Sequence, residues 1–272
     1  MRIGTRGSAL ALAQAGTVAE ALGGELVTIT TSGDRDRARG DKERWVREID
    51  RALLAGEVDV AVHSAKDVPG ELAAGIVIAA APPRADPRDA LCGAPSLAAL
   101  PPGARIGTSS VRREAQLRAA REDLEVVELR GNVDTRLRKL AGGEADAIVL
   151  AAAGLQRLGL GWDGLLPFTP AAGQGVLAVC TRAGEEHLAA PADDEAAHRA
   201  LRAERALVVA LEADCQTPVA AHFDGRTLRA FVGRADGSAW LRDELEGDDP
   251  EALGAEVAAR LRTAGADEVL GR

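Results

Sequence analysis

The sequence predicts an α/β protein with two similar lobes that flank a cleft, followed by a small α+β domain. Short strand-like and helix-like segments alternate over the first two-thirds of the 272 residues, as in α/β domains. The string RIGT of residues 2–5 recurs at residues 105–108, each time ahead of a helical pattern, which suggests two similar units. From about Asp194 the chain changes to alternating segments separated by Asp-Gly turns, which is typical of an antiparallel sheet.

The first lobe is expected to comprise residues 1–82 together with residues 176–193. Its expected elements are a strand 2–5, a helix 8–22 with Ser8 as N-cap, a strand 25–30, a helix with Trp45, Ile49, Ala52 and Leu53 on one face, and a strand 58–62. The proline-rich stretch 82–87 predicts a hinge after this lobe.

The second lobe is expected to comprise residues 86–169, with mainly parallel sheets in both lobes. Its expected elements are strands 105–108, 124–129 and 147–151 and a helix 132–141, after which a strand 176–181 could return to the first lobe.

The C-terminal α+β domain is expected at residues 197–272. The expected elements are a helix ending at Glu212, strands 219–223, 227–233 and 239–245, and a closing helix marked by Leu253, Val257 and Leu261. We expect an antiparallel sheet with its helices on one face.

Composition excludes several classes of protein. The 33 basic and 42 acidic residues give a net charge of −9, which argues against a nucleic-acid partner. No apolar run reaches the roughly 18 residues of a membrane span, and no signal-peptide profile opens the chain. Cys92, Cys180 and Cys215 are widely spaced, which favours neither a disulfide framework nor a metal site and points to the cytoplasm. Apolar neighbours predict that Cys92 and Cys180 are buried, whereas polar neighbours predict an exposed loop for Cys215.

Arginine is unusually frequent. Lysine occurs only at Lys42, Lys66 and Lys139, so the other thirty basic residues are arginines. Codon bias of a GC-rich genome explains the excess as such, but several arginines follow predicted strands or begin predicted helices. Ligands of open α/β sheets bind at the carboxyl ends of the strands. Because arginine binds carboxylates and phosphates with two parallel hydrogen bonds, these positions predict a ligand with several such groups.

Both RIGT turns combine hydroxyls, arginines and the start of a helix, where anions bind. The residues concerned are Thr5, Arg6 and Ser8 in the first turn and Thr108, Ser109, Ser110, Arg112 and Arg113 in the second, while Arg130, Arg136 and Arg157 follow other strands. Ordinary helix capping with surface arginines is the alternative. Glycine-rich nucleotide loops are absent from the sequence, so nucleotides are disfavoured.

One acid stands among these bases. Asp67 closely follows the strand 58–62, directly after Lys66. A carboxylate in a basic cleft suits general acid/base catalysis or the stabilisation of a developing cation. A turn-forming aspartate or a local ion pair is the alternative.

These residues lie in strings that resemble one enzyme family along nearly the whole chain. The strings are RIGTRGSALALAQA (2–15), VDVAVHSAKDVP (58–69), DPRDAL (86–91), IGTSSVRR (106–113), LRGNVDTRL (129–137), AIVLAAAGLQRLGL (147–160), PAAGQG (170–175) and LEADCQTP (211–218). In this order, they are similar to those of the porphobilinogen deaminases, also called hydroxymethylbilane synthases.

The resemblance implies a fold and an activity. It implies two lobes like those of periplasmic binding proteins and a third domain whose loop cysteine, here Cys215, holds a dipyrromethane cofactor through a thioether. The enzyme adds four porphobilinogens to this primer, each with loss of ammonia, and releases the linear tetrapyrrole hydroxymethylbilane by hydrolysis. This reaction belongs to haem and chlorophyll biosynthesis. The resemblance also suggests a monomer that could hand its product to the next enzyme of the pathway.

The resemblance also assigns residues. Asp67 matches the catalytic carboxylate, which is thought to contact pyrrole N–H groups and stabilise an electron-poor azafulvene. The residues expected to bind the cofactor besides Cys215 are Ser64, Lys66, Thr108, Ser110, Arg112, Arg113 and Gly131. The residues expected to bind substrate are Arg6, Ser8, Gln14, Arg130, Arg136, Arg157 and Gln174. Each pyrrole carries two carboxylates, so a six-unit chain brings about twelve negative charges to the predicted arginine cleft.

The sequence departs from the family pattern in two segments. Residues 31–45 are shorter than usual and lack a Gly-Lys-Gly-aromatic pattern, for which Lys42 and Trp45 are possible replacements. Ala213 and Asp214 stand where the family has two glycines, and the added carboxylate could change the loop or raise the pKa of Cys215. A non-catalytic, two-lobed protein that binds polycarboxylates is the rival hypothesis, but such a protein has no use for Cys215.

Overall fold

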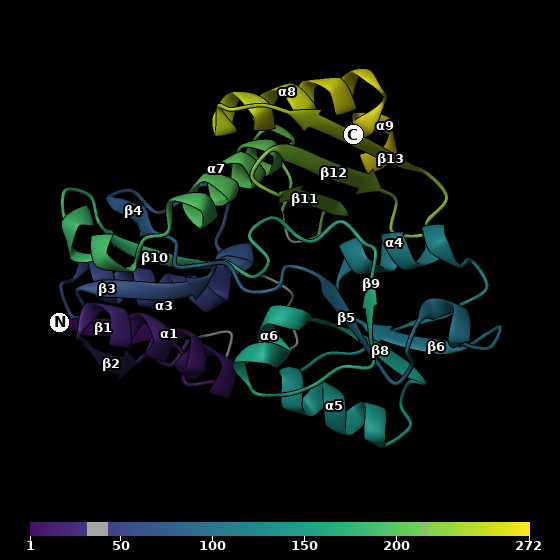
Figure 1. The fold of residues 1–272 in the computed structure, drawn as a ribbon, viewed down its shortest axis with the longest axis horizontal. Coiled ribbons are helices and arrows are strands. Elements are labelled where there is room, and N and C mark those ends of the chain that lie inside the picture. The colour runs from purple at the N-terminus through teal and green to yellow at the C-terminus, as the bar shows by residue number, and fades with distance from the viewer. Residues whose placement is uncertain (32–42, 215) are drawn as a thin grey trace.

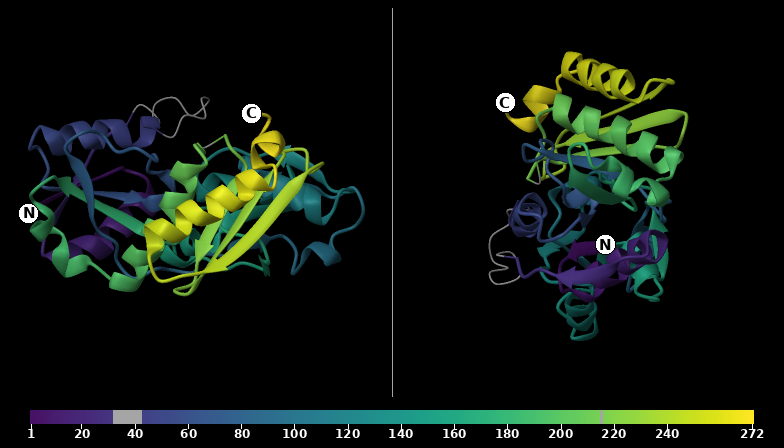
Figure 2. Two further views of the ribbon diagram at one scale, coloured as in Figure 1. Left: turned by 90° about the horizontal axis from the view of Figure 1, so that it is seen from above. Right: turned by 90° about the vertical axis from the view of Figure 1, so that its left-hand side faces the viewer.

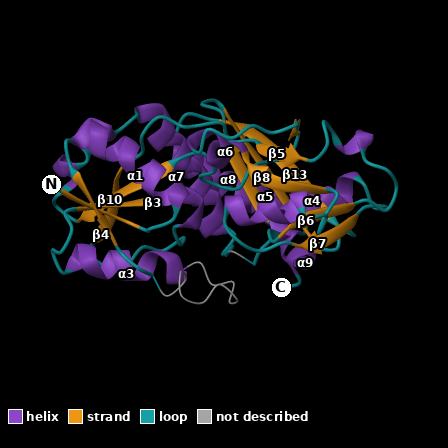
Figure 3. Cartoon of the chain, turned by 90° about the horizontal axis from the view of Figure 1, so that it is seen from below, coloured by secondary structure: helices purple, strands orange, loops and turns teal. Residues whose placement is uncertain are grey.

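The computed structural model describes residues 1–31, 43–214 and 216–272, with the backbone alone at residues 43–45. Within these ranges the chain forms two five-stranded sheets and one three-stranded sheet (Figure 1). The strands of the two larger sheets form separate groups when the molecule is seen from below (Figure 3). The expected combination of two α/β lobes with an α+β domain is therefore confirmed.

The sheet of the first lobe has the strand order β2-β1-β3-β10-β4. The strands are β1 (Arg2–Thr5), β2 (Glu25–Thr28), β3 (Val60–Ser64), β4 (Ile76–Ala80) and β10 (Leu177–Arg182). Helix α1 (Ala9–Leu22) covers one face, where Val18 packs with Ile3 and Val62. Helix α3 (Glu43–Leu54) covers the other face, where Ile49 and Leu53 are fully buried.

The sheet of the second lobe has the strand order β7-β6-β8-β5-β9. The strands are β5 (Asp89–Cys92), β6 (Arg105–Thr108), β7 (Glu125–Glu128), β8 (Ala147–Ala151) and β9 (Gly164–Leu166). The helices are α4 (Val111–Ala120), α5 (Val133–Ala141) and α6 (Ala152–Arg157).

The two sheets correspond strand by strand. In each, the RIGT strand runs parallel to its two neighbours, β2 and β3 or β7 and β8. The arginine that begins each RIGT strand pairs with the aspartate that directly precedes the third strand, Arg2 with Asp59 (2.6 Å) and Arg105 with Asp146 (3.1 Å). The repeated string therefore marks a repeated unit of structure.

Each sheet is mixed, because one strand runs opposite to the other four, so the expectation of mainly parallel sheets holds for four strands of each. β10 runs antiparallel to β3 and β4, and β5 runs antiparallel to β8 and β9. Both β5 and β10 follow a segment that crosses from the other lobe, so the rule that successive βαβ strands are parallel does not apply to them. The strand expected at 176–181 does join the first sheet, whereas the domain limits given above stay a prediction.

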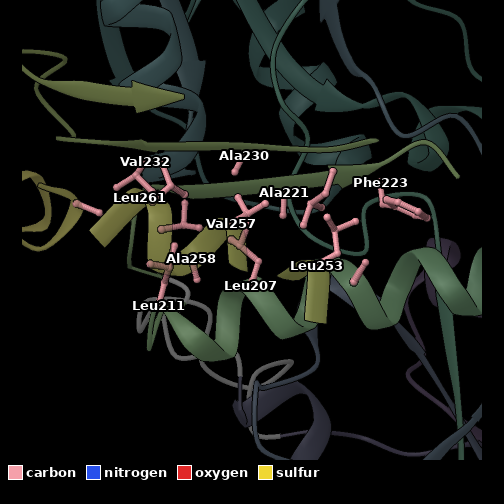
Figure 4. Packing of buried hydrophobic residues seen from close by; sticks show 14 of the residues in the cluster. Leu207, Leu211, Ala221, Phe223, Ala230, Val232, Leu253, Val257, Ala258 and Leu261 are labelled. Carbon is pink, nitrogen blue, oxygen red and sulfur yellow. The ribbon is translucent and has the colours of Figure 1, made fainter. Parts of the chain in front are cut away.

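The C-terminal domain lies across both lobes on one side of the molecule (Figures 1 and 2). Its elements are α7 (Glu195–Ala210), β11 (Val219–Phe223), β12 (Thr227–Gly233), β13 (Trp240–Glu246), α8 (Pro250–Thr263) and α9 (Ala266–Leu270). The helices pack on one face of the antiparallel sheet through a core that includes Leu207, Phe223 and Val257 (Figure 4). On its other face, Phe231 packs against Ala115 of α4.

Most expected elements are present with small shifts at their ends, and four were not expected. The strand expected at 58–62 is β3, which begins two residues later and runs to Ser64. Strands β4, β5 and β9 and helix α9 were not expected. Cys92 and Cys180 are buried as expected. Lys42, the side chain of Trp45 and Cys215 lie outside the described residues. In the described part of the chain, no helix has the length and apolar character that crossing a membrane requires.

Candidate active-site cleft

A cleft of about 680 Å³ is lined by residues of both lobes. All fifteen residues that the resemblance assigns to the site and that the structure describes line it: Arg6, Ser8, Gln14, Ser64, Lys66, Asp67, Thr108, Ser110, Arg112, Arg113, Gly131, Arg130, Arg136, Arg157 and Gln174. Ser109 of the second RIGT turn also lines the cleft, whereas Thr5 of the first turn is buried and is not among the lining residues. Cys215 lies outside the described residues, but its neighbour Gln216 lines the same cleft. Residues chosen from separate strings of the sequence are thus brought together.

The two RIGT turns present helix N-termini to the cleft. Ser8 is the N-cap of α1 and accepts a hydrogen bond from the amide of Ala11 (3.3 Å), and Ser110 caps α4 through the amide of Arg113 (3.4 Å). Thr108 accepts a bond from the amide of Ser110 (3.2 Å). The capping alternative is therefore correct for these hydroxyls, and it does not exclude anion binding because both helix starts line the cleft.

Asp67 lies in the cleft wall at the end of a short 3₁₀ turn, Ala65–Asp67, that directly follows β3. Its side chain is half-buried. The preceding residue, Lys66, donates a hydrogen bond to Oε1 of Gln174 (3.3 Å). The turn after β3 therefore places the ammonium group of Lys66 and the carboxylate of Asp67, which are adjacent in sequence, in the wall of the same cleft.

Arg112 and Arg113 are almost fully buried, and a third buried residue, Asp89, holds both. Arg112 donates to both oxygens of Asp89 (2.7 and 3.0 Å), and Nε of Arg113 donates to Oδ1 (2.9 Å). Burial by itself would raise the pKa of Asp89, but the two guanidinium charges outweigh that effect and hold this pKa well below its usual range. The carboxylate is therefore ionised and fixes the arginine pair.

Arg136 and Arg157 have only uncharged partners among the described residues. Arg136 donates to the carbonyl of Gly131 (2.9 Å) and to Oγ of Ser109 (2.8 Å), and Arg157 donates to the carbonyl of Gly175 (2.7 Å). Burial lowers the pKa of each to about 10, and for Arg136 the nearby charges of other arginines add to this effect. Both positive charges are thus partly desolvated without a described counter-ion, which favours an anionic ligand.

The other two arginines that were expected to bind substrate lie in more open positions. Arg130 is exposed and pairs with Glu128 (2.7 Å) at the end of β7, and Arg6 is half-buried. Among the described residues, the cleft lining carries seven arginine or lysine side chains and four carboxylates. The cleft is therefore basic in a protein whose net charge is −9.

Gln174 lies between the lobes and is 1% exposed. Its Nε2 donates to the carbonyl of Pro87 (2.7 Å) and to Oδ1 of Asp89 (2.9 Å), while its Oε1 accepts from Lys66. Both ends of the amide therefore have partners within the protein. A hydrogen-bonded chain runs through Gln174 from Lys66 in the first lobe to the arginine pair in the second.

Sequence reasoning missed two buried acids. Asp89 belongs to the DPRDAL string but was given no role. Glu204 of α7 is fully buried and accepts hydrogen bonds from Arg84 (2.5 Å) and the amide of Gly173 (2.6 Å), so it holds both segments that cross between the lobes. A signal was present for Glu204, since it falls four residues after Ala200 within the apolar stripe of its helix.

Asp214, which departs from the family pattern, takes part in a turn. Its Oδ1 accepts hydrogen bonds from the amide of Gln216 (2.9 Å) and from the hydroxyl of Thr217 (2.6 Å). The bond from Thr217 is the largest cause of the lowered pKa of Asp214. The extra carboxylate therefore makes local hydrogen bonds to two residues that follow position 215.

Comparison with known proteins identifies relatives along almost the entire chain. Residues 1–190 match the family model "Porphobilinogen deaminase, dipyromethane cofactor binding domain", and residues 198–263 match "Porphobilinogen deaminase, C-terminal domain". Porphobilinogen deaminase of Rubrobacter xylanophilus is 48% identical over 99% of this chain and 96% of its own length. Porphobilinogen deaminase of a Roseiflexus species is 49% identical over 98% of this chain and 97% of its own length.

Among solved structures, a periplasmic substrate-binding protein of an ABC transporter from Coxiella burnetii is similar over 73% of this chain and 94% of its own chain, with 19% identity and a TM-score of 0.42. The assignment rests on the family models and on the relatives that are nearly half identical over nearly their full length. The chain belongs to the porphobilinogen deaminase family.

Proposed function

We propose that this chain joins four porphobilinogen molecules head to tail, with loss of ammonia at each addition, on a dipyrromethane held by Cys215 through a thioether. Hydrolysis then releases hydroxymethylbilane. The observation that carries this proposal is the convergence of all fifteen described site candidates on one basic cleft that also contains Asp67.

Arg6, Arg130, Arg136 and Arg157 bind the acetate and propionate groups of the substrate and the growing chain. The support is electrostatic, because Arg136 and Arg157 are desolvated cations whose described partners carry no charge. A carboxylate of the ligand supplies the missing counter-charge through two parallel hydrogen bonds. Ser8 and Gln14 of α1 line the same side of the cleft and complete the polar wall.

The cofactor fits the inner part of the cleft. A dipyrromethane has four carboxylates, and Lys66, Arg112 and Arg113 would hold them together with the hydroxyls of Ser64, Thr108 and Ser110 at the two helix starts. Gly131 lines the cleft with a φ of +130°, and a Cβ there would lie 2.7 Å from the side chain of Thr135, so this turn before α5 requires glycine. When bound, the cofactor supplies the pyrrole carbon to which the first substrate is joined.

Asp67 acts as the catalytic carboxylate. From the cleft wall it accepts hydrogen bonds from pyrrole N–H groups and stabilises the positive charge that develops as the amine leaves. Fixed carboxylates of this kind work best where surrounding groups hold them still, and the 3₁₀ turn after β3 gives Asp67 such a support.

Gln174 serves as a positioning residue and does not bind substrate through its amide. Its donors and its acceptor are engaged with Pro87, Asp89 and Lys66. Asp89 positions Arg112 and Arg113 in the same way. Together they tie the cofactor-binding side chains of the two lobes to each other.

The non-catalytic binding protein has no support in the comparisons, since both matching family models carry the name of the enzyme. The test is the intact mass of the protein purified from cells that make porphobilinogen, with an Ehrlich colour test for pyrroles. We expect a mass increment of one dipyrromethane and a positive colour, both lost in Cys215→Ser. A bare-chain mass without colour in the unaltered protein would refute the proposal.

We also infer that the enzyme acts as a monomer in the cytoplasm and hands its product to the enzyme that next acts on linear tetrapyrroles. The family resemblance supports the monomer, and the free thiols of Cys92 and Cys180 support the cytoplasm. Light scattering on a size-exclusion column should give the mass of one 28.1 kDa chain. A dimer mass at micromolar concentration would contradict the monomer.

A further inference from the structure

Helix α7 of the C-terminal domain places Arg205 on the backbone that directly follows Asp67. The guanidinium donates to the carbonyls of Pro69 (2.7 Å) and Gly70 (2.8 Å) and, more weakly, to that of Val68 (3.4 Å). These partners lie more than 130 residues away in sequence. One side chain of the third domain thus binds three consecutive carbonyls of a loop in the first lobe.

The loop needs an external anchor. The 3₁₀ turn 65–67 ends with a bond from the amide of Val68 to the carbonyl of Ala65 (3.2 Å), and Pro69 has no N–H with which to continue the pattern. The carbonyls at the end of such a turn carry partial negative charge that a nearby cation stabilises. Arg205 supplies that cation and at the same time fixes the direction of the three carbonyls.

Arg205 is held there at an electrostatic cost. Burial lowers its pKa, and its hydrogen-bond acceptors in the described part of the chain are backbone carbonyls. A surface arginine on the same helix, Arg202, instead forms an exposed pair with Glu251 (2.5 Å). The half-buried position of Arg205 is therefore specific to the loop that it contacts.

The same helix leads to the residue that carries the cofactor. α7 ends at Ala210, and residues 211–214 connect it to Cys215. Its residue Glu204 holds the two segments that cross between the lobes, as described above. α7 thus contacts the loop that follows Asp67 and both segments that cross between the lobes, and it leads into residues 211–214 before Cys215.

We propose that Arg205 is a positioning residue that sets the place of the Asp67 carboxylate relative to the growing chain. This inference rests on the proposed function, in which Asp67 is catalytic. A displacement of a catalytic group by about 1 Å lowers a rate by as much as roughly 100-fold. The C-terminal domain is therefore part of the catalytic machinery as well as the carrier of the cofactor.

The test compares Arg205→Met and Arg205→Lys with the control Arg202→Met. In Arg205→Met we expect the mass of bound dipyrromethane to be retained, because the cleft arginines are unchanged, while kcat falls by roughly 10- to 100-fold and KM changes less than about threefold. The kcat of Arg205→Lys should lie between those of Arg205→Met and the unaltered protein, because lysine keeps the charge and loses the two-pronged geometry. Arg202→Met should leave both constants unchanged.

Two further measurements separate positioning from general destabilisation. Amide hydrogen exchange of residues 65–72 should quicken in Arg205→Met and stay unchanged in Arg202→Met, and added guanidinium should restore part of the kcat of Arg205→Ala. A folded Arg205→Met that keeps wild-type kcat and its adduct would overturn the role of Arg205 alone. An unaltered protein without adduct or ammonia release would instead overturn the proposed function.

Discussion

At the scale of single residues, the site combines charges that are neutralised within the protein with charges that are not. Arg112 and Arg113 have Asp89 as a buried counter-ion, whereas Arg157 has only a carbonyl among its described partners. A buried cation without a counter-ion costs folding free energy, which a bound anion recovers. The charge of Arg157 that would attract an anionic ligand therefore lowers the stability of the fold without ligand.

This effect on stability gives a prediction for Arg157→Met. The lowered pKa of Arg157 shows that its charged form is disfavoured in the folded protein, so replacing it with an apolar side chain of similar length should leave the thermal midpoint unchanged or raise it. KM for porphobilinogen should rise by roughly tenfold, which corresponds to about 1.4 kcal/mol. Calorimetry and initial rates check the two effects.

Arg226→Met provides the control for Arg157, since the exposed Arg226 pairs with the exposed Glu246 of β13 outside the cleft lining. Its KM should equal that of the unaltered protein. A fall of the Arg157→Met midpoint by several degrees with unchanged KM would show that Arg157 serves the fold and not the ligand.

At the scale of elements, the two lobes share the same order of strands and helices through their third strand and differ in the residues that follow it. Each has an RIGT strand, a serine-capped helix and a third strand that ends at the cleft. After that third strand, the first lobe presents Lys66 and Asp67, and the second presents α6 with Arg157. The repeat thus supplies two similar anion sites, with the carboxylate on one side only.

Helix α4 depends on its attachment to β5 through Asp89. We predict that Asp89→Asn folds but loses much of its cofactor, because the new amide N–H groups face two guanidinium groups and the arginine pair moves. The measurement is the fraction of protein that carries the adduct by intact mass. The surface variant Asp123→Asn, whose partner Arg121 lies outside the cleft lining, should keep full occupancy. Full occupancy in Asp89→Asn would contradict the role given to Asp89.

The elements also show what the sequence could predict. The repeated RIGT strings identified β1 and β6 with their exact limits, since local strand and capping signals agree there. Strands β5 and β9 were missed because four and three residues carry too little periodicity. The antiparallel direction of β5 and β10 depends on where the chain crosses between lobes, which no local pattern records.

In the candidate site, too, features set by local sequence were predictable and features set by long-range contacts were not. Arginines at strand ends and the lone Asp67 were predictable, because position relative to a strand end is a local property. Asp89 and Arg205 were not, because each acts on partners that only the folded chain brings together, such as Arg205 with the carbonyls after Asp67. Gln174 was expected to bind substrate and does line the cleft, while its partners in both lobes became visible only in the structure.

At the scale of the whole molecule, buried carboxylates hold the three parts together. Glu204 joins the C-terminal domain to both crossing segments, and Asp89 joins β5 to α4 and to Gln174. Burial opposes ionisation of both acids, but the arginine charges beside them prevail and lower both pKa values. Acid should therefore weaken the assembly of the domains.

The sign of the pH effect follows from these lowered values. A carboxyl whose folded pKa lies below its unfolded pKa, which is about 4, stabilises the fold above pH 4, and this contribution is lost as the pH falls through the folded pKa. In urea titrations from pH 7 to pH 3, the free energy of unfolding should therefore fall most steeply below about pH 4.5. Glu204→Gln should be less stable at pH 7 by roughly 3 kcal/mol, and its free energy of unfolding should fall less steeply as the pH is lowered.

The exposed variant Glu251→Gln serves as the control for this titration and should follow the curve of the unaltered protein, because its pair with Arg202 lies at the surface. If Glu204→Gln shows the same pH slope as Glu251→Gln, the buried carboxylate is not the source of the acid sensitivity.

We propose that the basic cleft is the catalytic site and that Asp67 is its catalytic carboxylate. The most direct test is ammonia release from porphobilinogen by Asp67→Asn, measured on protein whose intact mass shows bound dipyrromethane. We predict that the adduct is retained, because the cofactor-binding side chains are unchanged, and that the rate of ammonia release falls by at least about 100-fold. Undiminished ammonia release by this variant would contradict the account.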